Sequence, residues 1–255
     1  MIPYELLITA VSDRADLFQL SVDSMLRNLD QAPARVVVHE DVRPGTQSGE
    51  IHRCLAELKA AGRIAEYALQ VTSPARGMGP AILWVLREAQ TQTVLYTQED
   101  WLATRPVPVR SAMDLMRRFG LYHVRFNKRK TMPSKHADTP HPWLKLQVEY
   151  GGQTLCVSDH WYTQTSLWMR DIAMPGVEAV AETHPQSNAF AAKFNGWMNR
   201  RFGDGRAWND QHMRDQLLRT YIWGGVGEPA YVKHIGSERG TGVIQNHLTH
   251  KEKRA

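Results

Sequence analysis

Two adjacent carboxylates, Glu99 and Asp100, follow a run of strand-forming residues in the octapeptide V-L-Y-T-Q-E-D-W, residues 94–101. Two like charges side by side are unfavourable unless water or a cation lies in front of them. Carboxylate oxygens are hard ligands that suit Mg²⁺ or Mn²⁺, and these ions usually keep further positions for water and substrate phosphates. The pair therefore indicates either a divalent-metal site that also binds a diphosphate, or a solvated turn after a strand.

Polar residues follow two other expected strands in the same way. Ser12-Asp13-Arg14 comes after the first strand, and Glu40-Asp41 comes after the second. In open α/β sheets, ligands bind beyond the carboxyl ends of the strands, so these side chains are candidates for one site. Asp13 also has an ordinary explanation, because Asp is a favoured N-cap at the start of a helix.

The first half of the chain alternates strand and helix signals, and these elements must position the acids. The expected strands cover residues 4–11, 34–39, 65–71 and 93–97, and the expected helices begin at Asp13, Ile51 and Gly79. The order strand-helix-strand predicts an α/β fold with a mostly parallel, Rossmann-like sheet and helices on both faces.

The second half has a different pattern of apolar and polar residues. Residues 121–127 and 144–150 alternate like strands with one wet face, and Gly151-Gly152 predicts a turn after the second of them. Residues 131–142 indicate a mobile loop, and residues 189–201 and 210–223 are expected to be helices. No segment resembles an interdomain linker, so we expect one domain over residues 1–255, with a mixed second half.

The composition is that of a folded globular protein, with 255 residues, 42% hydrophobic residues and eight Trp. The apolar run Tyr4 to Val11 is strand-length and lacks a basic lead and a cleavage site, so it is neither a signal peptide nor a membrane span. Two cysteines are too few for a disulfide framework. A reduced, cytoplasmic setting is therefore expected.

Positive charge is concentrated in a few segments of a chain whose net charge is +5. The clusters are His123 to Lys130 with Lys135, Arg200-Arg201 with Arg206, and the tail Lys251 to Arg254. Clusters of this kind attract polyanions such as nucleic acid, a phosphorylated substrate or a membrane surface, although a merely solvated basic face is the plainer reading.

Together, the acidic strand ends, the Gly77-Met78-Gly79-Pro80 loop and the motif V-L-Y-T-Q-E-D-W resemble the GT-A nucleotide-sugar glycosyltransferases, in which a hydrophobic strand ends in an Asp-x-Asp-like motif. Asp159 to Arg170 is similar to their acceptor-side segment. Tyr231 to Gly236 is similar to the segment whose histidine completes the metal site in many such enzymes. The resemblance extends from about residue 4 to about residue 240. It departs at Gln98, which replaces the first acid.

The resemblance implies a role for each matching residue. Asp100 and His234 would bind the Mn²⁺ or Mg²⁺ ion, and Glu99 would bind the metal or the ribose. Glu40 or Asp41 would contact the uridine or the ribose of the donor, while Arg76 and Asp13 would approach the base or the phosphates. It also implies a nucleotide-sugar half at about residues 1–103 and an acceptor half at about 104–245, followed by a basic tail.

An inverting transferase needs a carboxylate to take the proton of the acceptor hydroxyl. Asp210 and Asp159 are the candidates, with a slight preference for Asp210 at the start of an expected helix. Trp161 is one of several tryptophans that could offer a stacking face. The cations Arg125, Lys128, Arg129 and Lys130 would suit a phosphate groove beside a flipped-base pocket.

The expected acceptor is a hydroxymethylated base in DNA, as in enzymes that modify viral DNA in the host cytoplasm. A saccharide or lipid-linked glycan is the alternative acceptor. From other classes, a nucleic-acid-binding module with a degenerate active site and a nucleotidyltransferase stay open, although the latter needs a third carboxylate that the sequence does not identify. The oligomeric state stays open as well.

Overall fold

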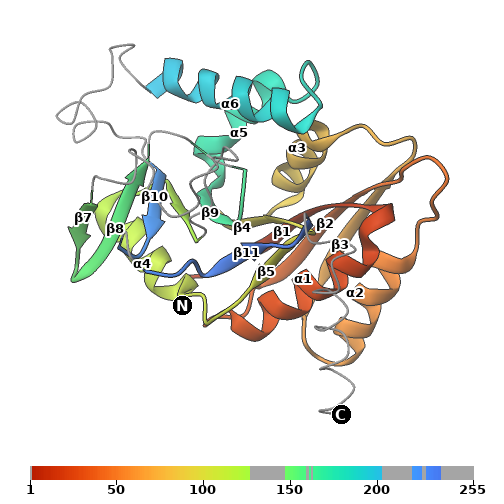
Figure 1. The fold of residues 1–255 in the computed structure, drawn as a ribbon, viewed down its shortest axis with the longest axis horizontal. Coiled ribbons are helices and arrows are strands. Elements are labelled where there is room, and N and C mark those ends of the chain that lie inside the picture. The colour runs from red at the N-terminus through yellow and green to blue at the C-terminus, as the bar shows by residue number, and fades with distance from the viewer. Residues whose placement is uncertain are drawn as a thin grey trace, which may run out of the picture.

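A nine-stranded sheet carries the fold in the computed structural model of this chain, which describes residues 2–126, 147–158, 161, 163–202, 220–225 and 228–236 (Figure 1). The first half contributes β1 (Glu5–Val11), β2 (Arg35–Asp41), β3 (Tyr67–Thr72) and β4 (Thr93–Gln98). These four strands are parallel to one another. The helices between them are α1 (Ala15–Asn28), α2 (Glu50–Ala60) and α3 (Met78–Glu88), and a short 3₁₀ turn, Ser12–Arg14, precedes α1. The alternation predicted from the sequence is confirmed.

The sheet continues without a break into the second half, in the order β3-β2-β1-β4-β9-β6-β10-β8-β7. Its further strands are β6 (His123–Arg125), β7 (Gln147–Tyr150), β8 (Gln153–Ser158), β9 (Ser166–Met169) and β10 (Thr220–Trp223). Strand β9 is antiparallel to both β4 and β6, so this half of the sheet is mixed. The predicted turn at Gly151-Gly152 joins β7 to β8, with both glycines at positive φ.

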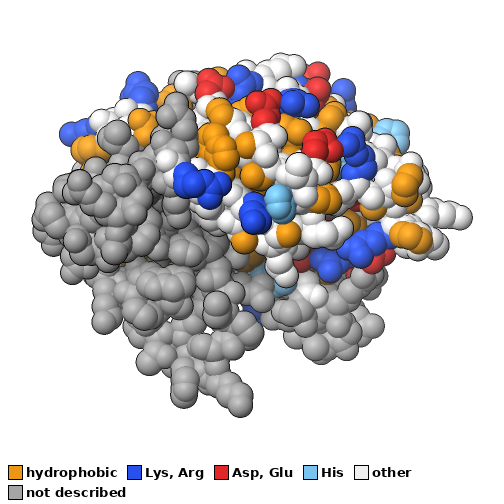
Figure 2. All heavy atoms as spheres, turned by 90° about the horizontal axis from the view of Figure 1, so that it is seen from above, with side chains coloured by type: hydrophobic (Ala, Val, Ile, Leu, Met, Phe, Trp, Pro, Cys, Tyr) orange, Lys and Arg blue, Asp and Glu red, His pale blue; other side chains and the backbone are white. Residues whose placement is uncertain are grey.

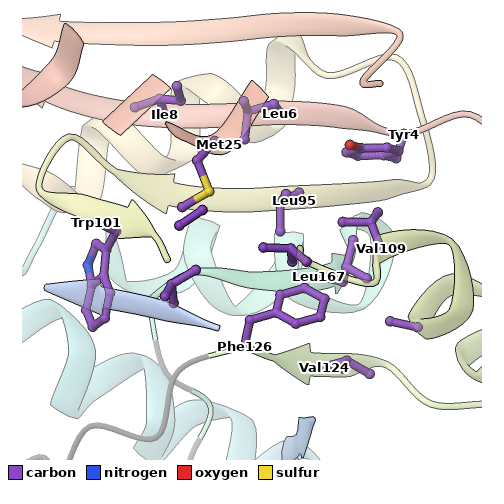
Figure 3. Packing of buried hydrophobic residues seen from close by; sticks show 14 of the residues in the cluster. Tyr4, Leu6, Ile8, Met25, Leu95, Trp101, Val109, Val124, Phe126 and Leu167 are labelled. Atoms are coloured by element: carbon purple, nitrogen blue, oxygen red, sulfur yellow. The ribbon is translucent and has the colours of Figure 1, made fainter. Parts of the chain in front are cut away.

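Helices cover both faces of the sheet, as expected. Helices α1, α2 and α4 (Val109–Phe119) bury their apolar residues on one face, where they meet Leu6 and Ile8 of β1 (Figure 3). Helices α3, α5 (Arg170–Val180) and α6 (Ser187–Phe202) cover the other face, where they meet Leu7 and Val37. Successive strand residues point to opposite faces, so a strand buried on both sides is apolar nearly throughout.

Three features of the second half differ from the sequence prediction or were not predicted. Residues 220–223 form strand β10 between β6 and β8, whereas a helix was predicted over 210–223; the remainder of that helix lies outside the described residues. All four residues of T-Y-I-W are buried, and their β-branched and aromatic side chains suit a central strand. Helices α4 and α5 were not predicted. The loop expected at 131–142 lies outside the described residues.

A second, two-stranded sheet joins distant parts of the chain. Strand β5 (Trp101–Ala103) directly follows the acid pair, and β11 (Val232–His234) pairs with it in antiparallel orientation. The register places His234 opposite Trp101. This pairing brings the C-terminal segment to the end of β4.

Candidate functional site

A hollow of about 660 Å³ lies at the carboxyl ends of the parallel strands. The residues around it come from the ends of β1, β2 and β4, from the start of α3, and from the segment after β11. Those that the following paragraphs use are Arg14, Asp41, Gly77, Gln98, Glu99, Asp100, His234 and Gly236. The position agrees with the general rule for ligand sites in open α/β sheets.

Glu99 and Asp100 are both nearly buried at this hollow, and one arginine bridges them. Nη1 of Arg14 lies 3.2 Å from Oε1 of Glu99 and 3.1 Å from Oδ2 of Asp100. Burial and, secondly, the neighbouring charge of Asp100 raise the pKa of Glu99 to about 8, although Arg14 opposes both effects. The acid pair is therefore neither a solvated turn nor an exposed charge pair.

His234, in the C-terminal segment of the described chain, contacts Asp100. Its Nε2 lies 3.0 Å from Oδ2 of Asp100, which requires Nε2 to carry the hydrogen in this contact. Trp101 packs against the imidazole with ring centroids 5.2 Å apart, and the backbone N–H of Ile235 donates to the carbonyl of Asp100 at 2.8 Å. These contacts fix the ring beside the carboxylate, at the end of β11.

Gly236 is packed directly against Asp100. A Cβ atom at position 236 would collide with Oδ2 of Asp100 and lie 3.1 Å from its Cγ. Only a residue without a side chain allows this approach, so Gly236 is part of the construction of the site.

Asp41 organises the wall of the hollow formed by the loop between β3 and α3. Its two carboxylate oxygens accept hydrogen bonds from the backbone N–H groups of Arg76, at 3.1 Å, and Gly77, at 2.7 Å. The Arg76 side chain points instead to Glu182, with an N–O distance of 2.8 Å. Asp41 therefore shapes the loop, while Arg76 faces α5 rather than the acid pair.

The other predicted donor-side residues lie near this wall. Glu40 is 1% exposed and is not among the residues around the hollow, and burial followed by the charge of Glu50 raises its pKa. Asp13 lies inside the 3₁₀ turn, 3.8 Å from Nε of Arg43. Val11 occupies the N-cap position of this turn, so the capping explanation for Asp13 is wrong.

Gln98, at the place of the first acid of the motif, points away from Asp100. Its amide nitrogen lies 3.2 Å from Sδ of Met78 and 3.3 Å from the carbonyl oxygen of Thr163. The side chain therefore ties the end of β4 to the start of α3 and to the segment before β9.

Two of the predicted acceptor-side residues are buried. Trp161 is 4% exposed and stacks on the imidazole of His123, with ring centroids 4.4 Å apart. Arg125 is 2% exposed. The structure therefore places neither side chain on an open face. Asp159, Asp210, Lys128, Arg129 and Lys130 lie outside the described residues.

The donor atoms around Asp100 partly fit a divalent cation. Oδ2 of Asp100 and Nε2 of His234 are donor atoms of the kind that bind divalent cations, and they lie 3.0 Å apart, so both could bind one ion once the hydrogen on Nε2 is displaced. Within the part of the chain that the structure describes, no group of three His, Cys, Asp or Glu side chains encloses such a point. The structure therefore offers a two-residue site, with Glu99 joined to it only through Arg14.

Sequence reasoning missed the position of Arg14, although it identified the segment Ser12-Asp13-Arg14 as a polar strand end. The signal was a cation at the same sheet edge as two acids. This signal could not predict the contact between Arg14 and the acids, because the direction of the Arg14 side chain depends on how the 3₁₀ turn leaves β1.

These features define an open α/β fold with a mostly parallel, partly mixed sheet and a ligand-sized hollow at its strand ends, and the fold class predicted from the sequence is confirmed. No protein-family model matches the sequence, and no curated protein matches it. Solved structures do match. S. aureus TarS superposes with a TM-score of 0.58 at 10% identity, over 90% of this chain and 36% of TarS.

Two further structures carry ligands. TarS residues 1–349 in complex with UDP give a TM-score of 0.57 at 10% identity, over 89% of this chain and 59% of that one. A mannosyltransferase from Pyrobaculum calidifontis, in complex with GDP-Man and Mn²⁺, gives 0.50 at 16% identity, over 69% of this chain and 47% of that one. The likeness is one of fold, and this chain spans little more than a third of the length of TarS.

Proposed function

We propose that this protein transfers a sugar from a nucleotide-sugar donor, most simply a UDP-sugar, to a hydroxyl group of an acceptor. The observation that carries the proposal is the group Arg14, Glu99, Asp100 and His234 beside a hollow at the strand ends. Support comes from the fold, because structures with this fold have been solved with UDP and with GDP-Man.

The reaction breaks the bond between the anomeric carbon and the diphosphate oxygen and forms a bond from that carbon to the acceptor oxygen. The electron pair of the broken bond leaves with the diphosphate, so negative charge develops there. Asp100 and His234 would hold a divalent cation, which neutralises this charge when bound. Arg14 adds a fixed positive charge at the same wall of the hollow.

The base that receives the acceptor proton is proposed from the sequence alone. Asp210 and Asp159 keep that role as hypotheses, because both lie outside the described residues. Replacing each by Asn distinguishes them, because loss of the true base must lower kcat with little change in donor affinity.

For the acceptor, a saccharide hydroxyl is favoured over a hydroxymethylated base in DNA. Arg125, the one described member of the predicted phosphate groove, is buried. The described part of the face over α3, α5 and α6 mixes cations with acids, including the ion pairs Arg76–Glu182 and Arg87–Glu178 (Figure 2).

Within the described ranges, none of the helices has the length and apolar character that a membrane span requires.

Donor binding is tested by calorimetry with UDP, UDP-sugars and GDP-Man, with and without Mn²⁺. We expect Asp100→Ala to remove metal-dependent binding and sugar transfer, while Asp114→Ala, on the exposed surface of α4, leaves both unchanged. The proposal fails if wild-type protein binds no nucleotide or nucleotide sugar under any of these conditions.

Salt dependence separates the two acceptors. Duplex binding through phosphate contacts must weaken steeply with salt, and Lys128→Ala/Arg129→Ala must flatten the log–log slope by about two units. A saccharide acceptor should respond little to salt. Steep DNA binding without any nucleotide binding would instead support the nucleic-acid-binding module.

A further inference from the structure

Arg14 is placed where two different partners compete for it. It ends the 3₁₀ turn that follows β1, and it lies at the wall of the hollow with 33% of its side chain exposed. Its Nη1 contacts one oxygen of Glu99 and one of Asp100. The structure describes no other Lys or Arg in an ion pair with either acid. In the described part of the chain, Arg14 is thus the counter-ion of the acid pair.

The contacts of Asp100 determine which oxygen a new cation can reach. Oδ1 is buried and has no hydrogen-bond partner among the described residues. Oδ2 contacts both Nη1 of Arg14, at 3.1 Å, and Nε2 of His234, at 3.0 Å. A cation that arrives from the hollow must therefore bind at Oδ2, which Arg14 already occupies.

A divalent ion between Asp100 and His234 would face the guanidinium at close range. Like charges a few ångströms apart repel each other more strongly near a protein surface than in water, and a doubly charged ion increases the penalty. The ion and Arg14 cannot share Oδ2 without this penalty. The guanidinium can leave, because its other side borders the hollow.

A displaced Arg14 would have a new partner at once. A guanidinium binds phosphate oxygens in a bidentate, charge-assisted geometry, and the diphosphate of a donor is the anion expected in this hollow. The exchange would leave both the acids and the diphosphate paired with a cation.

We propose that Arg14 is an exchangeable counter-ion: it contacts Glu99 and pairs with Asp100 in the free protein, and it moves to the donor diphosphate when a divalent cation binds Asp100. This inference rests on the proposed function for its second half. Its first half, competition between Arg14 and the metal, depends only on the residues of this chain. Arg14 is then a positioning residue for the diphosphate and sets the order in which metal and donor bind.

The experiment measures Mn²⁺ binding by electron paramagnetic resonance in the absence of nucleotide, followed by UDP binding by calorimetry. The variants are Arg14→Ala, Arg14→Met, which keeps most of the apolar stem, and Arg14→Lys. The matched control is Arg53→Ala on α2, where the side chain is 71% exposed and pairs only with Glu57. Circular dichroism establishes that each variant is folded.

We expect Arg14→Ala and Arg14→Met to bind Mn²⁺ about tenfold more tightly than the wild type, since a competing cation has been removed. Both should bind UDP about tenfold more weakly than the wild type in the presence of saturating Mn²⁺, when the wild-type arginine is free to bind the diphosphate, and Arg14→Lys should lie between them and the wild type. A merely structural role would not raise metal affinity.

Unchanged or weaker Mn²⁺ binding in both folded variants would overturn the inference and leave the proposed function standing if the wild type binds UDP. Tighter Mn²⁺ binding in a protein that binds no nucleotide would uphold the exchange at the acids and refute the proposed function. The two failures are therefore distinguishable.

Discussion

Replacing Asp41 tests whether this carboxylate builds the site or only borders it. Its two oxygens accept the backbone N–H groups of Arg76 and Gly77, and the side chain is almost wholly buried. Each hydrogen bond to a buried charged group contributes about 1.5–3 kcal/mol. Asp41→Ala removes both bonds and leaves two backbone donors unpaired.

The expected loss of unfolding free energy is about 2–4 kcal/mol, less than the sum of the two bonds because water can enter the space left by the side chain. Asp41→Asn should lose about half as much, since one oxygen is kept while the amide nitrogen faces an N–H group. UDP affinity should fall in both variants, because the loop around Gly77 borders the hollow.

Urea unfolding followed by tryptophan fluorescence gives the free energies by linear extrapolation. Asp114→Ala is the control, since this side chain is exposed and forms only a long ion pair with Arg117. An unfolding free energy for Asp41→Ala within about 0.5 kcal/mol of the wild type would refute the structural role. Weaker UDP binding without lost stability would instead favour direct contact with the donor.

Three further predictions concern the same neighbourhood and the core behind it. Gly236→Ala should weaken Mn²⁺ binding about tenfold or more by pushing the carboxylate of Asp100 aside, measured by the same resonance titration; an unchanged affinity would contradict the packing. The pKa of Glu99 is about 8 in the folded protein, above its value in the unfolded chain, so folding favours the protonated form. In urea titrations, the stability of the wild type relative to Glu99→Gln should therefore fall by a few kcal/mol as the pH rises from about 4.5 to 8. Parallel pH curves for these two proteins would show that Glu99 is ionised throughout. Burial, with a smaller effect of Arg125, lowers the pKa of His123. Below about pH 6.5 the wild type should therefore lose about 1.4 kcal/mol of stability per pH unit relative to His123→Asn in the same urea titrations.

The sheet of the first half was predictable because three of its four strands, β1, β2 and β4, are buried on both faces and are largely apolar. The runs around Leu6, Val37 and Leu95 have no polar face, and each ends on polar residues at the same edge of the sheet. The positions of Asp41, Glu99 and Asp100 at that edge followed directly. The pairing of His234 with Asp100 followed from a resemblance, not from spacing.

The second half was less predictable because tertiary contacts decide its elements. Pro175 and Gly176 lie inside α5, where both residues disfavour a helix, and a Cβ at Gly176 would lie 2.8 Å from Phe194 of α6. Close packing of the two helices explains the glycine. Strand β10 was read as a helix because its four residues were joined to the segment before them, and only its neighbours β6 and β8 identify it as a central strand.

The pairing of β11 with β5 has a consequence for the order of folding. The two strands are separated by about 130 residues, and closing so long a loop costs entropy that only the completed pairing offsets. Strands β1, β2 and β3 pair across about 30 residues, and β1 pairs with β4 across about 90, so these pairings close shorter loops and can form earlier. During folding, Glu99 and Asp100 would thus come together with Arg14 before His234 arrives. A folding chain would first form the group of Arg14 with the two acids, and the candidate site would be complete only after β11 had paired with β5.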